Sequence, residues 1–237
     1  MRGGVEPSSR ASFRNCKKGL KKFLAFTLAE TLIVMGIIGI VSALTLPNLN
    51  SSTGEKEKVA KLKKIYQNLD DAYGRATAVY GPISEWGLED DSYGEKDNCN
   101  VFWGRMLEFM KVSKTASSYT VYTEIILADG SSVWIYNTPS SNADSSSHYP
   151  GVDWYGSIQV DIDGPNKGKN KFGYDKFAFS ITNQGILPES TSTRLGDEPA
   201  EKFDDEYYAT AWVIMNENLD YLKCFDDLNW DTKTSCK

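Results

Sequence analysis

The feature that most constrains this chain is an apolar run close to its N-terminus. The 21 residues from Phe26 to Leu46 contain one charged side chain, Glu30. As an α-helix with a rise of ~1.5 Å per residue, the run would be roughly 31 Å long, about the thickness of the hydrocarbon part of a bilayer. We therefore predict one membrane-spanning helix at the N-terminus, with the larger part of the chain following it.

Charge is distributed unevenly about this run. Residues 1–25 contain seven Lys or Arg and one Glu, whereas the rest of the chain contains 19 basic and 31 acidic residues. Cytoplasmic flanks of membrane helices are enriched in Lys and Arg, so the basic N-terminus is expected in the cytoplasm and the acidic body across the membrane. The acidic body argues against general nucleic-acid binding, which needs clustered positive charge.

Three interpretations of the apolar run compete. It could be a secretory signal peptide cleaved after Ala43, although its apolar core is longer than usual and contains an acid. It could be a plain anchor, which leaves Glu30 in the membrane at a cost of roughly 2.5–3.5 kcal/mol. In the third interpretation Glu30 has a function.

The third interpretation rests on residues 25–30, Ala-Phe-Thr-Leu-Ala-Glu, which follow a basic leader. This segment resembles the processing site of type IV prepilins and type II secretion pseudopilins. The resemblance implies cleavage between Ala25 and Phe26, N-methylation of Phe26, and retention of the apolar helix. Pro47 stands where members of the family commonly have a helix-kinking proline. Ala25 is a departure, because the family usually has Gly there.

The chemistry of the cleaved segment gives Glu30 a role. Cleavage creates an amine on Phe26, and such amines have an ordinary pKa near ~8. Glu30 lies one helical turn further along, or faces the amine of an adjacent subunit in a packed bundle. In a low-dielectric setting the pair is favoured over either charge alone, so Glu30 is predicted to be the assembly residue. The alternative is that Glu30 snorkels at the helix end.

Helical periodicity continues beyond the apolar run and ends at Gly81-Pro82. Apolar residues recur there at steps of three and four, which predicts a helix face packed on a sheet; they are Val59, Leu62, Tyr66, Leu69, Tyr73, Ala76 and Tyr80. A short helix is predicted at about 101–112, within a longer connection.

Strand patterns follow. Residues 120–127 and 133–137 are predicted to form a hairpin through the turn at 128–131. Further strands are predicted at 157–162, at 177–181 with 186–187, and at 211–215, and residues 188–206 are predicted to be a surface excursion. This order predicts an α+β fold. The resemblance implies a pilin-like one, in which a long N-terminal helix packs on an antiparallel sheet.

The expected organisation has five parts. They are a leader that is removed (1–25), the membrane-spanning and assembly half of the helix (26–50), its amphipathic half (51–81), a connecting region (82–118), and the sheet with a disulfide-tied tail (119–237).

Three cysteines lie beyond the leader. Cys224 and Cys236 enclose eleven residues and resemble the C-terminal disulfide loop of many pilins; closing such a loop is worth ~2.5–3 kcal/mol. Cys99 could pair with either of them. The single histidine, His148, lies in a polar loop without other metal-binding residues nearby, so we expect it to be an ordinary loop residue.

A glycine-rich turn at 161–175 has acids at both ends. Its oxygen side chains, on Asp161, Asp163, Asn170 and Asp175, are of the type that Ca²⁺ prefers, and the stretch resembles an Asp- and Gly-rich loop of secretion pseudopilins, some of which bind calcium. Four lysines nearby oppose a cation; they are Lys167, Lys169, Lys171 and Lys176. A solvated turn and a basic nucleic-acid-binding patch are the alternatives.

No nucleophile–base pair, phosphate loop or ligand cluster stands out, so we predict a non-enzymatic structural subunit. The resemblance implies a pilin or pseudopilin that polymerises from the bacterial inner membrane, in type II secretion or a type IV pilus. Its expected partners are copies of itself and other pilin-like subunits, the prepilin peptidase and methylase, an inner-membrane assembly platform and lipid. The alternatives are a membrane-anchored extracytoplasmic enzyme or binding domain, and a minor pilin for DNA uptake.

Overall fold

A computed structural model of the chain describes residues 27–90, 96–115, 117–143, 151–189, 209–230 and 232–236, without the side chains of 42–53 and 96. The chain divides into two units, Met1–Asn48 and Leu49–Lys237. The described part of the first unit is the beginning of helix α1 (Leu28–Tyr80). Nine apolar side chains between Leu28 and Val41 are exposed there, Leu28 to 80% and Met35 to 72%.

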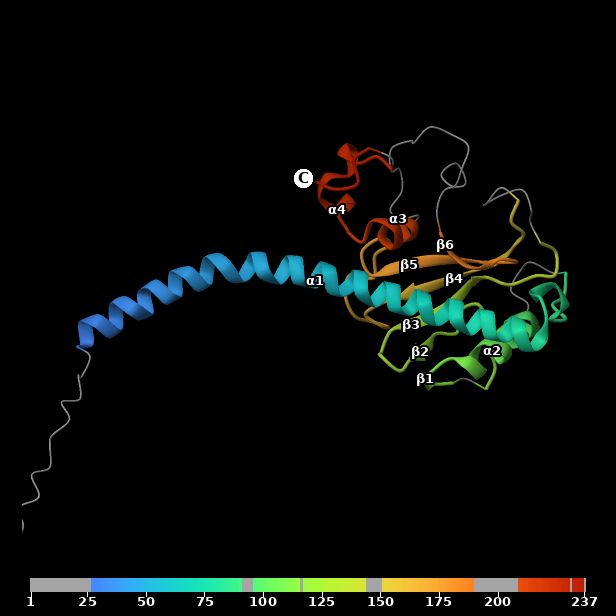
Figure 1. The fold of residues 1–237 in the computed structure, drawn as a ribbon. Coiled ribbons are helices and arrows are strands. Elements are labelled where there is room, and N and C mark those ends of the chain that lie inside the picture. The colour runs from blue at the N-terminus through green and yellow to red at the C-terminus, as the bar shows by residue number, and fades with distance from the viewer. Residues whose placement is uncertain are drawn as a thin grey trace, which may run out of the picture. The chain divides into compact units, whose positions relative to one another are not determined.

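The second part of α1 lies across a sheet within the second unit (Figure 1). As predicted, Val59, Leu62, Leu69, Tyr73 and Ala76 are buried in the core. The ring of Tyr66 stacks on Phe179 with centroids 5.5 Å apart. The helix ends as predicted at Gly81, whose φ of 80° favours glycine and whose amide donates to the carbonyl of Thr77.

A 3₁₀ turn, η1 (Ile83–Glu85), precedes α2 (Lys96–Met106), which continues into a second turn, η2 (Leu107–Phe109). The helix predicted at about 101–112 therefore exists but begins earlier in the chain. Its inner face buries Cys99, Phe102, Trp103 and Met106 at helical spacing.

The sheet has six strands in chain order, each antiparallel to its neighbours. The strands are β1 (Val112–Lys114), β2 (Ile125–Leu127), β3 (Ser132–Asn137), β4 (Trp154–Asp161), β5 (Lys176–Thr182) and β6 (Gly185–Pro188). Ile158 of β4 lies opposite Phe179 of β5, and Ile181 lies opposite Ile186 of β6. The α+β fold and the hairpin of β5 and β6 are as predicted.

Two strand predictions need correction. The strand predicted at 120–127 begins only at Ile125, because residues 120–123 form a turn in which the amide of Thr123 donates to the carbonyl of Thr120. The strand predicted at 211–215 is wrong, because these residues belong to helix α3 (Ala209–Asn216). A short, wholly apolar run has no periodicity that separates the two structures. Here Ala211, Trp212 and Val213 are all buried.

The chain closes with a short helix, α4 (Tyr221–Cys224), and a 3₁₀ turn, η5 (Phe225–Asp227). Across the described side chains, no helix is both long and apolar enough to cross a membrane. Part of the predicted span, Phe26 and the side chains at 42–46, lies outside the described residues.

Candidate functional site

The segment predicted to direct assembly begins α1. The carboxylate of Glu30 accepts two hydrogen bonds at Oε2, one from the amide and one from the hydroxyl of Thr27, both at 2.8 Å. The Glu30 amide donates back to Oγ1 of Thr27 at 3.2 Å. This reciprocal pair is a capping box, which satisfies donors that the first turn of a helix leaves free. The Thr-x-x-Glu spacing of residues 27–30 is the local sequence signal of this cap.

The remaining predicted residues of this segment are less fully described. Ala25 and Phe26 lie outside the described residues. Helix α1 is assigned without a break through Pro47, whose side chain is not among those described. The kink at Pro47 and the cleavage after Ala25 stay predictions.

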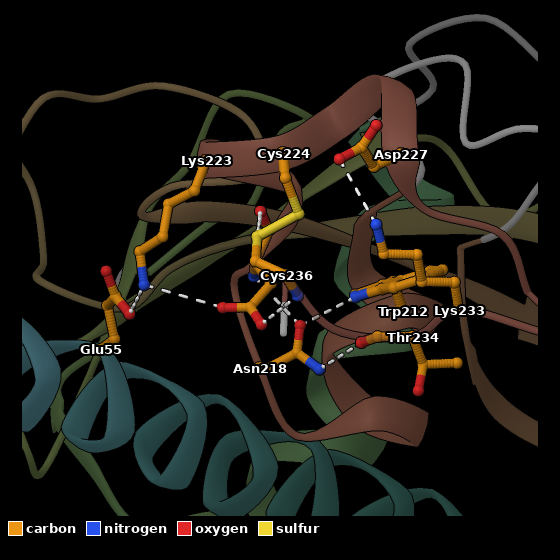
Figure 2. The surroundings of a disulfide bond; sticks show 10 residues. Glu55, Trp212, Asn218, Lys223, Cys224, Asp227, Lys233, Thr234 and Cys236 are labelled. Carbon is orange, nitrogen blue, oxygen red and sulfur yellow. Dashed lines mark hydrogen bonds and ion pairs between the residues drawn. A yellow bond between two sulfur atoms is a disulfide. The ribbon is translucent and has the colours of Figure 1, made fainter.

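At the other end of the chain, Cys224 and Cys236 form a disulfide with their Cα atoms 5.8 Å apart. This is the pair that encloses the eleven-residue loop. Cys99 is a buried thiol instead, and burial raises its pKa. The disulfide joins the last residues of the chain to α4 (Figure 2).

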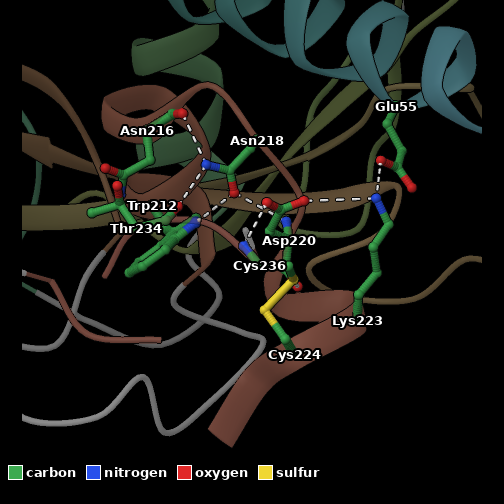
Figure 3. Close-up of polar contacts among 9 residues, drawn as sticks. All are labelled: Glu55, Trp212, Asn216, Asn218, Asp220, Lys223, Cys224, Thr234 and Cys236. Atoms are coloured by element: carbon green, nitrogen blue, oxygen red, sulfur yellow. Dashed lines mark hydrogen bonds and ion pairs between the residues drawn. A yellow bond between two sulfur atoms is a disulfide. The ribbon is translucent and has the colours of Figure 1, made fainter. Parts of the chain in front are cut away.

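Hydrogen bonds fix this closed tail to the helices around it; we call Asn218, Asp220, Lys223, Cys224 and Cys236 the C-terminal clamp (Figure 3). The Asn218 side chain makes four bonds. Its Oδ1 accepts from the indole of Trp212 and the amide of Asp220, and its Nδ2 donates to the carbonyls of Asn216 and Thr234.

Two other members of the clamp, Asp220 and Lys223, form further bonds. Oδ2 of Asp220 accepts from the amide of Cys236 at 3.0 Å, beside the disulfide. Nζ of Lys223 donates to Oε2 of Glu55 on α1 at 2.6 Å, and this bond raises the pKa of Lys223. The disulfide-tied tail is thus bonded to α3, α4 and α1.

The loop at 161–175 is organised around the carboxylate of Asp175, which is fully buried. Three successive backbone amides donate to it: those of Lys169 and Asn170 to Oδ2, and that of Lys171 to Oδ1 at 2.6 Å. Successive amides that converge in this way form an anion-binding nest. Here the chain's own carboxylate fills the nest.

Left-handed backbone makes this loop possible. Gly164, Gly168 and Asn170 have φ of 87°, 66° and 52°. A Cβ atom on Gly168 would lie 2.4 Å from Oδ2 of Asp175 and 2.6 Å from Oδ2 of Asp163. Glycine is therefore required at 168, both for its φ and for the closeness of the two carboxylates.

The four predicted calcium ligands do not form a metal site as they lie. Oδ1 of Asp161 accepts from the amides of Asp163 and Gly164, and Nδ2 of Asn170 donates to the carbonyl of Lys167. Both oxygens of Asp175 are occupied by amides. Within the described ranges, no three His, Cys, Asp or Glu side chains are grouped to hold a metal ion. Because Ca²⁺ takes six to eight oxygens, a calcium ion at these residues stays a prediction.

Asp161 has one buried carboxylate oxygen, Oδ2, that accepts no hydrogen bond within the described residues. The residue is 1% exposed. Burial, together with the charge of Asp175, raises the pKa of Asp161.

His148 and most of the predicted excursion at 188–206 lie outside the described residues, whereas Pro188 and Glu189 are described.

Comparison with known proteins finds one relevant similarity. Over 77 residues, 30% of this chain, the sequence is 35% identical to Type II secretion system core protein G of Vibrio cholerae serotype O1 (strain ATCC 39315 / El Tor Inaba N16961). The likeness is to a type II secretion protein. The chain spans about half the length of this curated relative. No family model matches the chain, and no solved structure matches it.

Proposed function

We propose that the chain is a structural, non-enzymatic subunit of the type II secretion pseudopilin kind, held in the bacterial inner membrane by its N-terminal helix. The observation that carries this proposal is the 35% identity to a type II secretion core protein. The prepilin-like segment and the α+β fold of the second unit, Leu49–Lys237, which we call the head, are consistent with it. A type IV pilus subunit is the nearest variant of the same proposal.

The exposed side chains of the first unit give this proposal a physical basis. A contiguous set of exposed apolar side chains, such as that between Leu28 and Val41, needs a cover of lipid or of other apolar helices. A bilayer would cover them before assembly, and neighbouring copies of α1 would cover them afterwards. The proposed orientation has the basic leader in the cytoplasm and the head outside the inner membrane.

Glu30 would then exchange partners during assembly. In the single chain its carboxylate caps its own helix through Thr27, and loss of such a cap costs about 1 kcal/mol. The amine of Phe26 on a neighbouring copy offers a full positive charge, and an ion pair away from water is stronger than a hydrogen bond in which only the acceptor is charged. The cap would hold the carboxylate in place until a neighbour arrives.

The test is cleavage by the prepilin peptidase followed by mass measurement of the mature N-terminus. An N-terminus at a methylated Phe26 is expected. An N-terminus at Leu44 would instead identify a signal peptide and overturn the proposal. An uncut chain would identify a plain anchor.

A further inference from the structure

Two lysine side chains converge on one aromatic ring in the head. Nζ of Lys58, on α1, lies 3.3 Å from the ring centroid of Tyr174, and Nζ of Lys169 lies 4.2 Å from the same centroid. Lys58 also donates to the carbonyl of Tyr174 at 3.2 Å. The ring attracts each ammonium group, but it also brings two like charges close together.

Within the part of the chain that the structure describes, neither ammonium group forms an ion pair with a carboxylate. Two of the three acids of the 161–175 loop are buried, since Asp161 and Asp175 are 1% and 0% exposed, whereas Asp163 is partly exposed. Oδ1 of Asp161 and both carboxylate oxygens of Asp175 accept hydrogen bonds from backbone amides of the loop.

The fold thus separates the charges of the 161–175 loop. Two of its three acids, Asp161 and Asp175, lie inside and Asp163 is partly exposed, whereas residues 166–171, with three lysines, are all exposed. We call Lys58, Lys167, Lys169 and Tyr174 the lysine–tyrosine patch. It stands on a chain whose net charge is −6, so an anionic partner is attracted here rather than to the surface in general.

We propose that the lysine–tyrosine patch binds the phosphate headgroups of anionic phospholipids, an inference that rests on the membrane anchorage proposed above. A phosphate has oxygens on several sides, so one group can accept from two ammonium groups at once. Lys58 belongs to the part of α1 that follows the first unit in the chain. Tyrosine suits a membrane surface, because its ring is apolar and its hydroxyl is polar.

The first test uses the full chain in lipid nanodiscs of phosphatidylglycerol or of phosphatidylcholine, with lysine labelling read by mass spectrometry. Each lysine near an anionic membrane surface strengthens binding to it by a factor of roughly five in the binding constant. We therefore expect Lys58 and Lys169 to label about five-fold more slowly in phosphatidylglycerol. Lys111 and Lys114, exposed lysines at β1, should label equally in both. Equal labelling of Lys58 and Lys169 in the two lipids would overturn the inference.

Two additions to the phosphatidylcholine discs exclude other anions. If millimolar inorganic phosphate, or a short DNA duplex, protects the two lysines as well as phosphatidylglycerol does, the lipid inference is wrong. Anchorage is scored separately, by whether the chain co-purifies with the discs before any labelling. A chain that leaves the discs contradicts the proposed function, whereas a retained chain with unprotected lysines contradicts this inference alone.

The second test compares variants of the full chain in detergent, with native mass spectrometry of bound phosphatidylglycerol. K58Q/K169Q should weaken binding roughly 30-fold, whereas the control K111Q/K114Q has the same change in net charge and should bind as the original. K58R/K169R keeps both charges and should bind phosphatidylglycerol as tightly as the original. Equal loss in the two glutamine variants would show a general charge effect and refute a local site.

Discussion

Nζ of Lys223 lies 2.6 Å from Oε2 of Glu55, so the disulfide-closed tail is bonded to a helix 168 residues earlier in the chain. Both side chains are partly exposed, 50% for Lys223 and 30% for Glu55. Ion pairs of this kind contribute little, because water screens them and holding long side chains costs entropy. The stability of the tail must therefore come mainly from Asn218 and the disulfide.

Replacing Asn218 tests how much of the stability of the tail comes from this residue of the clamp. Asn218→Ala should lower the free energy of unfolding by about 2 kcal/mol, because it leaves the indole of the buried Trp212 without this acceptor and removes three further bonds. Lys223→Gln is the matched control and should cost less than about 1 kcal/mol. Urea unfolding of residues 49–237 measures both. If Lys223→Gln lowers the free energy of unfolding more than Asn218→Ala does, Asn218 is not the main hydrogen-bonding residue of the tail.

The disulfide should contribute more than any single hydrogen bond of the clamp. Replacing both Cys224 and Cys236 by Ser is expected to lower the free energy of unfolding by about 2–4 kcal/mol, since the open chain gains conformational entropy when unfolded. Reduction of the unmodified head should have the same effect. Cys99→Ala serves as the control, because it should leave the response to reductant unchanged. Mass spectrometry that finds both thiols free in the native protein would refute the pairing.

Glu189 makes the stability of the head dependent on pH. The residue is 3% exposed, accepts a hydrogen bond from Ser180 at 2.7 Å, and has no partner at Oε2. Burial raises the pKa of Glu189 from 4.5 to about 7. The folded state therefore binds more protons than the unfolded state between these values, so its stability falls as the pH rises from 4.5 to about 7.

Glu189→Gln should remove the contribution of this residue to that slope, because the amide is neutral at every pH. Above pH 7 the variant should be more stable than the original by up to about 3 kcal/mol. Urea unfolding across this pH range measures the difference. Glu217→Gln, which changes an exposed acid, should leave the slope in place. A slope that persists in Glu189→Gln would assign the pH dependence to another group.

Asp175 is expected to hold the 161–175 loop together without a metal ion. Asp175→Asn should lower the free energy of unfolding by roughly 2–3 kcal/mol, because three backbone amides lose a charged acceptor. Millimolar Ca²⁺ should leave the thermal midpoint of the unmodified head unchanged, since a ligand stabilises a protein only by binding its folded state. A calcium-dependent rise that Asp161→Asn abolishes would instead establish the calcium site.

Variants at Glu30 and Thr27 distinguish the role of Glu30 in capping its own helix from its role in assembly. Glu30→Ala should leave cleavage after Ala25 intact but prevent incorporation into filaments, because the amine of a neighbouring Phe26 loses its counter-charge. Thr27→Ala removes the cap and keeps the carboxylate, so it should assemble. Immunoblots of sheared filaments and of the processed subunit measure both steps. Normal filaments from Glu30→Ala, or equal loss in both variants, would refute the assembly role.

Long-range periodicity allowed much of the fold to be predicted from the sequence. The amphipathic stripe from Val59 to Ala76 extends over five turns, and Gly81 follows it, so helix α1 and its end were readable. The hairpin of Phe177–Ile181 with Ile186 was readable too, because its strands alternate and its turn is short. The Thr27-x-x-Glu30 capping signal is local too, because it depends only on residues three positions apart.

The structure of segments that depend on contacts with distant residues could not be predicted from the sequence and is known only from the tertiary structure. Residues 211–215 are apolar throughout, so a strand and a helix were equally consistent with the sequence until burial against β5 and β6 decided for the helix. Which oxygens of the 161–175 loop accept amides and which acids turn inward depends on left-handed backbone at Gly164 and Gly168. The meeting of Lys58 with Tyr174, and of Glu55 with Lys223, joins residues more than a hundred positions apart. A pattern along the chain determines local conformation and which face is apolar, but only the packed fold determines which distant side chains come within bonding distance.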